Sequence, residues 1–412
     1  MSSAAGSARV LLLVPARTYR AADFLTAASR LGVELAIGSD GALPLGGHPV
    51  VHVSPADPEG TVGRIMALDG RLDAVVAADT PMLMLAAVVA ERMGLPHNPV
   101  EAMIAAADKA EQRRRWAGAG VAQPESRLVP AGASAAAVRR AAAETGFPCV
   151  VKAVSLSASQ GVLRADDPAA AVAAALRIRR ILATAGRPAG EPLLVERYVP
   201  GCELSIDGLL TNGGLAVTAI FDKPEMPEGP TFEETMLVTP SRLPRPVLAG
   251  AIATAGRAAR ALGLTRGPLH AELRIDQRGG MAKPVMLELA ARTIGGLCSR
   301  ALCFGGGMSL EELVLADALG HPTPRHHTAR PAGVLMLPVP RQGVLRAVEG
   351  RSDAAAVPGI TGLTITIPAG QRVHPLPEGG RYLGFIFAEG DTPEQVEWAL
   401  GAARGHLRVL IE

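Results

Sequence analysis

The chain has 412 residues, enough for two or three domains with their own hydrophobic cores. Its formal net charge is +2 and only 3% of its residues are aromatic, so the composition indicates neither a nucleic-acid surface nor a polybasic membrane partner. Hydrophobic residues make up 48%, but no uninterrupted apolar run is long enough to span a bilayer. We therefore expect a cytoplasmic protein that binds no nucleic acid and no membrane.

The first hundred residues alternate between strand and helix patterns. The expected elements are strand 9–15, helix 21–31, strand 33–38, strand 73–78 and helix 81–93. Strands separated by helices predict a parallel sheet, so residues 1–105 are expected to form an N-terminal α/β domain. No GxGxxG follows the first strand, so a dinucleotide site is not indicated.

The middle of the chain, residues 106–320, holds every motif that carries chemistry. Its expected helices cover 106–118, 165–185, 246–262 and 309–319, and its strands 193–198 and 203–210 flank a Pro-Gly turn. A stretch rich in Pro, Gly and His at 320–332 is the expected linker. The last unit, 325–412, is expected to contain strands 333–337, 363–367 and 382–388 and a closing helix over 393–404.

Two glutamates stand sixteen residues apart on either side of a Gly-Gly turn. Glu272 lies in the strand-like run 269–276 and Glu288 in the run 284–290, which predicts a β-hairpin centred on residue 280. The two carboxylates would then be cross-strand partners, a destabilising arrangement unless a positive group lies between them. A divalent metal ion would be such a group, and an edge hairpin with two solvated acids is the alternative.

Lysine is rare in this chain. Of 41 basic residues only four are lysines, namely Lys109, Lys152, Lys223 and Lys283. A lysine kept where arginine otherwise supplies positive charge indicates a need for a compact ammonium group. Lys152 ends a buried-type strand and precedes a Ser-rich loop, a pattern typical of phosphate binding, although a plain surface turn is the alternative. Lys223 and Lys283 flank turns and are interpreted as surface charges.

The order of these motifs resembles the ATP-grasp superfamily. The series runs from Asp108-Lys109, through the Lys152 strand and the segment 195–203, to the Glu272 hairpin and Arg292. Within the superfamily, the segments 221–234 and 384–392 are similar to those of carboxylate–amine ligases related to L-amino acid ligases. Biotin carboxylase and carbamoyl phosphate synthetase are more distant relatives. The resemblance implies an α/β fold in three parts: a parallel-sheet domain, an α+β ATP-grasp domain with a mobile lid, and a small C-terminal α+β domain.

The resemblance also implies roles for particular residues. Lys109 and Lys152 would contact the ATP phosphates, Glu272 and Glu288 would bridge two magnesium ions, with Mn²⁺ as a substitute, and Arg292 would stabilise an acyl phosphate. Further nucleotide-binding positions would be Ser157, Ser159, Gln160 and Gly161 in the lid loop, Glu196, Arg197 and Val199 at the adenine, and Glu203 at the ribose. Catalysis would rest on Arg292, Glu288 and Lys152, and the substrate site would include Glu234, Arg292, Gly295 and Gly296.

Some alternatives stay open at this stage. Arg274 and Arg300 could serve where Arg292 is placed, and Glu196 and Glu203 could be ordinary hairpin charges. The superfamily usually has Asn two residues after the second metal glutamate, whereas this chain has Ala290, which cannot ligate a metal.

The function implied is an ATP-dependent ligase that joins a carboxylate to an amine, for example two amino acids. Its partners would be these small molecules, and formation of a homodimer is compatible with the sequence. The alternatives are a biotin- or bicarbonate-using ligase, a catalytically weak nucleotide-binding subunit, and a structural or binding α/β protein that would leave the lysine pattern unexplained.

Overall fold

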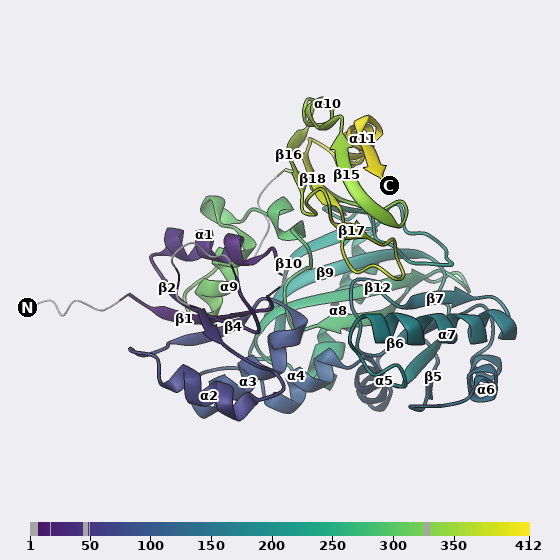
Figure 1. Cartoon of the computed structure of the whole chain (residues 1–412), viewed down its shortest axis with the longest axis horizontal. Coiled ribbons are helices and arrows are strands. Elements are labelled where there is room, and N and C mark those ends of the chain that lie inside the picture. The colour runs from purple at the N-terminus through teal and green to yellow at the C-terminus, as the bar shows by residue number, and fades with distance from the viewer. Residues whose placement is uncertain (1–6, 17, 44–47, 49, 325–329) are drawn as a thin grey trace, which may run out of the picture.

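A computed structural model describes residues 7–16, 18–43, 48, 50–324 and 330–412. The N-terminal part carries a parallel sheet in the order β3-β2-β1-β4, as the alternating pattern predicts (Figure 1). Its strands are β1 (Arg9–Val14), β2 (Glu34–Ser39), β3 (Val50–His52) and β4 (Ala74–Ala77). Its helices are α1 (Ala21–Leu31), α2 (Pro58–Met66), the 3₁₀ turn η1 (Thr80–Met82) and α3 (Leu83–Arg92).

A second, antiparallel sheet has the order β5-β8-β6-β7, and the expected lid loop lies between its strands β6 and β7. We call it the lid sheet. Its strands are β5 (Ser126–Val129), β6 (Cys149–Ala153), β7 (Val162–Ala165) and β8 (Leu193–Arg197). Helices α6 (Ala135–Thr145) and α7 (Pro168–Thr184) pack on this sheet through a shared apolar cluster. Asp167 accepts hydrogen bonds from two backbone N–H groups at the start of α7 and so fixes where that helix begins.

An eight-stranded sheet crosses the rest of the molecule in the order β13-β12-β9-β10-β11-β14-β18-β16. The strands from the central part are β9 (Cys202–Thr211), β10 (Gly214–Asp222), β11 (Met236–Thr239), β12 (Gly267–Asp276) and β13 (Lys283–Ala290). Those from the C-terminal part are β14 (Ala332–Leu337), β16 (Ile360–Ile365) and β18 (Gly384–Glu389). Since β11 pairs with β14, the two parts share one sheet, and the domain boundaries expected around 320–325 stay a prediction.

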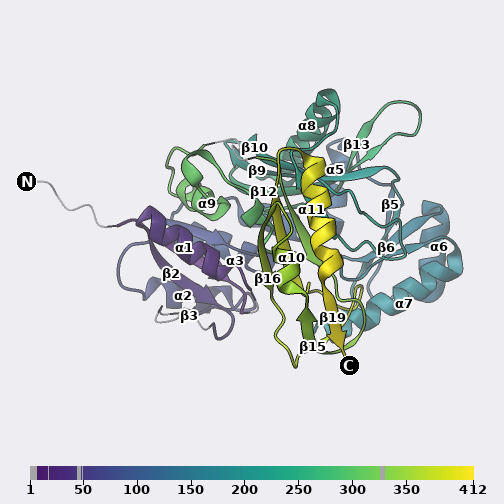
Figure 2. The same ribbon diagram turned by 90° about the horizontal axis from the view of Figure 1, so that it is seen from above.

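Helices and a small sheet complete the fold. The helices are α4 (Val100–Ala107), α5 (Lys109–Gly118), α8 (Arg245–Leu262), α9 (Leu310–Ala318), α10 (Arg351–Ala355) and α11 (Pro393–His406), with 3₁₀ turns η2 (Cys298–Ala301) and η3 (Gly305–Gly307). The small sheet joins β17 (Arg372–Val373), β15 (Gly343–Glu349) and β19 (Arg408–Ile411). Figure 2 shows α11 lying along the C-terminal strands. None of the described helices is long and apolar enough to cross a membrane.

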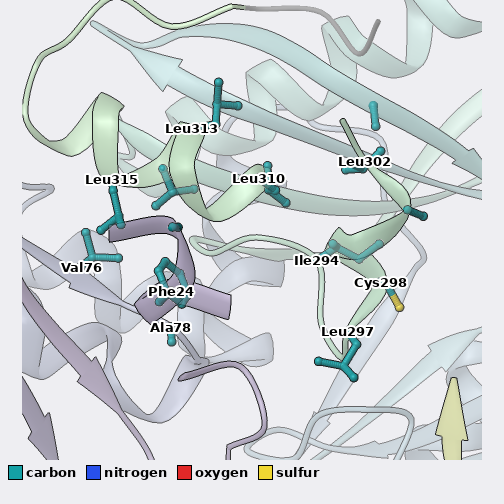
Figure 3. Close-up of a cluster of buried hydrophobic side chains, with 14 of the residues drawn as sticks. Phe24, Val76, Ala78, Ile294, Leu297, Cys298, Leu302, Leu310, Leu313 and Leu315 are labelled. Carbon is teal, nitrogen blue, oxygen red and sulfur yellow. The ribbon is translucent and has the colours of Figure 1, made fainter. Parts of the chain in front are cut away.

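Apolar packing joins the N-terminal sheet to the segment that follows Arg292. Phe24 and Val76 lie in one cluster with Ile294, Leu297 and η2 and α9 side chains (Figure 3). These side chains are almost fully buried, with Phe24 only 1% exposed. Burying such residues is worth about 1.5–3 kcal/mol per large side chain. The cluster therefore holds the end of the glutamate hairpin against the carboxyl ends of the parallel strands.

The predicted hairpin and its Glu272–Glu288 pair are confirmed, and a bulge after Glu272 shifts the register by one residue on the turn side. Glu272 on β12 stands opposite Glu288 on β13, and Gly279 and Gly280 both adopt positive φ in the connecting turn. Side chains alternate along β12, so Leu273 and its odd-numbered neighbours pack in the core beneath α8. The even-numbered positions face a cleft.

One helix boundary differs from the expectation. Residues 106–118 do not form one helix, because α4 ends at Ala107 and a new helix begins at Lys109. Asp108 adopts an extended conformation, and its carboxylate accepts hydrogen bonds from the N–H groups of Ala110 and Glu111. This cap places Lys109 in the first turn of α5.

Candidate active site

A cleft of about 400 Å³ lies where the N-terminal parallel sheet, the lid sheet and the eight-stranded sheet meet. It is bounded by the carboxyl ends of β1 and β4, the lid sheet, the open face of β9 and β12, and residues 380–382 from the C-terminal part. Ligand sites in α/β folds commonly lie at the carboxyl ends of parallel strands. The predicted site residues that line it are Lys109, Lys152, Ser157, Ser159, Glu196, Arg197, Val199, Glu203, Glu234, Glu272, Glu288, Arg292, Gly295 and Gly296.

Both lysines expected at the phosphates are buried in the cleft wall. Lys109 is 7% exposed, and its ammonium donates to the Leu156 carbonyl at 2.6 Å and lies 3.0 Å from the Glu288 carboxylate. Lys152 is 6% exposed and lies 2.8 Å from Glu196. Burial lowers the pKa of Lys152, and the neighbouring Glu196 carboxylate opposes that shift. Two ammonium groups from different elements therefore line the same cleft, and their contact with phosphates stays a prediction.

Glu196 holds the Lys152 ammonium in place. Its carboxylate accepts from Arg113 at 2.6 Å and from Lys152 at 2.8 Å, and the residue is only 3% exposed. Burial alone would raise the pKa of Glu196, but Arg113 and Lys152 outweigh burial and bring that pKa to about 2. The carboxylate is therefore ionised and positions a cation, while its contact with adenine stays a prediction.

The lid loop divides its residues between two tasks. Ser157 and Ser159 face the cleft, and Ser159 adopts the left-handed conformation at φ +56°. Gln160 and Gly161 do not line the cleft. The side chain of Gln160 donates to the Glu378 carbonyl at 2.8 Å, and the Gly161 amide donates to the Pro377 carbonyl at 3.3 Å. The loop is thereby joined to the segment that precedes β18.

The strand-to-turn segment at 197–199 forms another edge of the cleft. The Arg197 amide donates to the Glu125 carbonyl at 2.8 Å, and the Val199 carbonyl accepts from Arg274 at 2.9 Å. Within the described residues, the Val199 amide donates to no acceptor. A cleft-lining N–H with no protein partner suits the edge of a heterocyclic base. The contact between Val199 and the nucleotide stays a prediction.

The interpretation of Lys223 as a surface charge is wrong. Its side chain is only 1% exposed, and its ammonium lies 2.8 Å from Glu203, 3.8 Å from Glu272 and in contact with Glu234. Those three carboxylates lie within 4.8 Å of one another, the one acidic cluster of metal-binding spacing among the described residues. The protein's own ammonium already occupies that cluster. Lys283, by contrast, is exposed as predicted.

Two carboxylates of this cluster have pKa values shifted in opposite directions. Burial raises the pKa of Glu234, and Lys223 counteracts it only in part. Burial also tends to raise the pKa of Glu272, but Lys223, His270 and Arg292 outweigh it and leave that pKa well below its ordinary value. Glu203 is held by Lys223 and by Arg274 at 2.9 Å. Arg274 is thus committed to a carboxylate, which weakens it as an alternative to Arg292.

The Glu272 row suits a divalent cation. Ser205 on β9, Glu272 on β12 and Glu288 on β13 stand side by side in register, and the buried Ser205 hydroxyl has no hydrogen-bond partner. Carboxylate and hydroxyl oxygens are ligands that Mg²⁺ accepts, with water completing its coordination. The residues present therefore fit the metal that the superfamily implies, although Glu288 lies outside the tight acidic cluster around Lys223.

Arg292 lines the cleft. Its guanidinium donates to the Thr80 hydroxyl at 3.0 Å and to the Thr293 carbonyl at 2.7 Å, and it pairs with no described carboxylate. Gly295 and Gly296 line the cleft beside it, and Gly296 has φ +65° with the Phe385 ring where a Cβ would project. Arg300 faces away and pairs with Asp23 at 2.8 Å, so it is not the alternative.

Several residues in or behind the cleft wall were not identified from the sequence as parts of the site. His270, Tyr19 and Tyr382 line the cleft, with His270 beside Glu272. Arg113 and Lys223 do not line it, but they pair with the predicted residues Glu196 and Glu272. Burial lowers the pKa of His270, but Asp207 and then Glu272 outweigh burial and raise it to about 9. His270 could have been identified from the sequence, because it lies two residues before Glu272 and therefore on the same face of the strand. Arg113 could not, because nothing in the local sequence distinguishes it from the neighbouring arginines.

Comparison with known proteins finds two matching domains. Residues 145–301 match the ATP-grasp domain, and residues 335–412 match the L-amino acid ligase C-terminal domain 2. The chain contains an ATP-grasp domain. A crystal structure of L-amino acid ligase from Bacillus licheniformis superposes with a TM-score of 0.79 at 23% identity, covering 98% of each chain. The predicted resemblance and fold class are confirmed.

Curated relatives match more locally. Carnosine synthase 1 of Gallus gallus is 31% identical over 208 residues, which is 47% of this chain and 20% of that protein. Alanine–anticapsin ligase of Bacillus subtilis (strain 168) is 27% identical over 240 residues, 54% of this chain and 49% of the relative. The chain thus spans about a fifth to a half of the length of these two relatives.

Proposed function

We propose that this ATP-grasp protein is an ATP-dependent carboxylate–amine ligase. It would join a carboxylate, plausibly that of an amino acid, to an amine through an acyl phosphate and release ADP and phosphate. The observation that carries the proposal is the convergence of Lys109, Lys152, Glu272, Glu288 and Arg292 on one cleft, from four separate segments. The names of the similar ligases support the same reaction type.

A carboxylate needs activation, because its oxygen is a poor leaving group. Transfer of the γ-phosphoryl group makes phosphate the leaving group, and that transfer depends on charge neutralisation and positioning. Lys109 and Lys152 would bind the phosphates, each held by a carboxylate neighbour that fixes its ammonium. Glu272 and Glu288 would hold Mg²⁺, which neutralises phosphate charge when bound. The number of ions and the use of Mn²⁺ remain part of the proposal.

Arg292 would hold the carboxylate and then the acyl phosphate. A guanidinium can bind two oxygens of one anion in a fork, and Arg292 forms no ion pair with a carboxylate among the described residues. An acyl phosphate hydrolyses in open water, so the lid loop over the cleft must exclude solvent while the amine attacks. The contacts of Gln160 and Gly161 with residues 377–378 would hold that closed arrangement.

A phosphate-release screen tests the proposal. The protein is incubated with ATP, Mg²⁺ and pairs drawn from a matrix of amino acids and amines. Phosphate release that requires two substrates supports ligation. Release that requires only bicarbonate would instead favour the biotin- or bicarbonate-type alternative. No turnover with any pair would favour a nucleotide-binding subunit.

A further inference from the structure

Three adjacent strands place a histidine beside the glutamate row. Asp207 on β9, His270 on β12 and Ala290 on β13 stand opposite one another in register. The next row along the same face contains Ser205, Glu272 and Glu288. His270 therefore faces the cleft two residues from Glu272, and its cross-strand neighbour is a methyl group that leaves room for its ring.

The contacts of His270 fix the orientation of its ring. Its Nδ1 lies 3.1 Å from the Asp207 carboxylate, and its Nε2 points to Glu272, 3.4 Å from Oε1. The residue is 8% exposed. Asp207 is itself held, because its other oxygen accepts the Ile294 amide at 2.9 Å. Within the described residues, Nε2 has no partner other than Glu272.

We propose that His270 Nε2 is a ligand of the divalent ion held by Glu272 and Glu288, in place of the ligand that Ala290 cannot supply. This inference rests on the metal site of the proposed function. A carboxylate that accepts from one ring nitrogen directs the lone pair of the other nitrogen outward and makes it more basic, an arrangement common among metal-bound histidines. Asp207 is the positioning residue in that arrangement.

The acidic surroundings favour either a proton or a metal ion at Nε2, and the two compete. A metal ligand must be unprotonated, so binding of the ion displaces the proton from the ring. Nitrogen ligands suit transition-metal ions better than Mg²⁺, which prefers oxygen. The site should consequently bind Mn²⁺ more strongly than an all-oxygen site would, relative to Mg²⁺.

Pulsed electron paramagnetic resonance on the complex of the full chain with Mn²⁺ and ADP tests the assignment. The method detects ¹⁴N nuclei bonded to manganese. The wild type should show a histidine nitrogen coupling that His270→Gln removes. Exposed His52 on β3 provides the control, and His52→Gln should keep the coupling. Mn²⁺ affinity should fall by about tenfold or more in His270→Gln, with a smaller change for Mg²⁺.

A second variant separates ligation from positioning. Asp207→Asn should keep the nitrogen coupling and lower Mn²⁺ affinity about 10- to 100-fold, as for other outer partners of metal-bound histidines. If His270→Gln does not fold, the wild-type spectrum still decides: bound Mn²⁺ with no directly bound nitrogen overturns the inference.

Mn²⁺ binding to the glutamate variants distinguishes a failure of this inference from a failure of the proposed function. Mn²⁺ that binds without nitrogen but is lost in Glu288→Gln removes only the role of His270. Mn²⁺ binding that is unchanged in both Glu272→Gln and Glu288→Gln would remove the metal site, and with it the inference and the assignment of these glutamates in the ligase.

Discussion

At the scale of single residues, a buried cation is held by carboxylates from several elements. Lys152 pairs with Glu196 from the neighbouring strand, and Lys223 pairs with three glutamates from β9, β12 and the loop before β11. The scarcity of lysine drew attention to Lys152, which lines the cleft, and its contact with phosphate stays a prediction. The interpretation of Lys223 as a surface charge was wrong, because its immediate neighbours resemble a surface turn and its partners are brought in only by the sheet.

Lys152→Arg should weaken ATP binding. The guanidinium is wider than an ammonium and cannot act as a point charge between phosphate oxygens in a pocket where Lys152 is 6% exposed. We expect a rise of roughly tenfold or more in the ATP Kd, corresponding to about 1.4 kcal/mol, measured by calorimetry. Lys283→Arg, on the exposed hairpin end, is the matched control and should be silent. Equal effects at the two positions would contradict the argument from lysine scarcity.

Glu196 should make stability depend on pH in the acid range. Its pKa in the folded protein is about 2, below the ordinary 4.5, so its contribution is complete above pH 4.5 and is lost as the pH falls toward 2. The full loss is of the order of 3 kcal/mol. Unfolding free energies measured between about pH 2 and 5 should therefore fall less steeply in Glu196→Gln than in the wild type.

Glu111 provides the comparison for that experiment. Its pKa is also lowered to about 2, by hydrogen bonds from Arg114 and Arg115 near the surface. Exposed pairs are screened by salt, so at roughly 0.5 M salt the difference for Glu111→Gln should vanish. The difference for buried Glu196→Gln should persist. Identical slopes for wild type and Glu196→Gln would show that this ion pair does not carry the acid sensitivity.

At the scale of elements, the glutamate hairpin was the best-predicted feature. The Gly-Gly turn and the alternating runs determined its register, and the structure places Glu272 opposite Glu288. The sequence analysis did not predict several other features. The break at Asp108 depends on a side-chain cap, and strands β15 and β19 were missed because they pair with each other across a long stretch of sequence. Strand β10 was missed although the Asn212-Gly213 turn joins it directly to β9, which is a hairpin signal that the sequence carries. Sheet continuity through the β11–β14 pair was missed for the same reason.

Glu288→Gln should abolish ATP turnover while the fold survives. The change is isosteric on a cleft wall, where the Glu288 side chain is 32% exposed, so it removes charge without creating a cavity. We expect a loss of at least about 100-fold in kcat with a melting temperature close to that of the wild type. Ala290→Asn should be tolerated. Near-normal turnover of Glu288→Gln at limiting Mg²⁺ would show the metal assignment to be wrong.

Arg292→Ala should affect the intermediate and leave nucleotide binding intact. Arg292 follows the end of β13 and lines the cleft, where its guanidinium donates to the Thr80 hydroxyl and the Thr293 carbonyl. We expect a raised carboxylate KM and a kcat lowered by about 100-fold, with the ATP Kd nearly unchanged. Loss of ATP binding together with a lower melting temperature would indicate a structural arginine that ties β13 to η1.

At the scale of the whole molecule, the cleft is assembled from all parts of the chain. The N-terminal sheet contributes Thr80, the lid contributes Lys152, the central sheet contributes the glutamates, and the C-terminal part contributes Arg381 and Tyr382. The lid also contacts the C-terminal part directly, because Arg177 on α7 pairs with Glu378 through two hydrogen bonds of 2.6 and 2.9 Å. Exclusion of solvent from the cleft therefore depends on how the lid and the C-terminal part are placed relative to each other.

The measurement that tests the central claim most directly follows oxygen from the carboxylate. A carboxylate substrate labelled with ¹⁸O is turned over with ATP and the amine that the screen identifies, and the phosphate released is analysed by mass spectrometry. An acyl phosphate breaks at the bond between the acyl carbon and its bridging oxygen when the amine attacks, so one labelled oxygen must leave with phosphate. We predict phosphate carrying a single ¹⁸O, together with the amide and ADP. Amide formation with unlabelled phosphate, or with the label in AMP, would contradict the account.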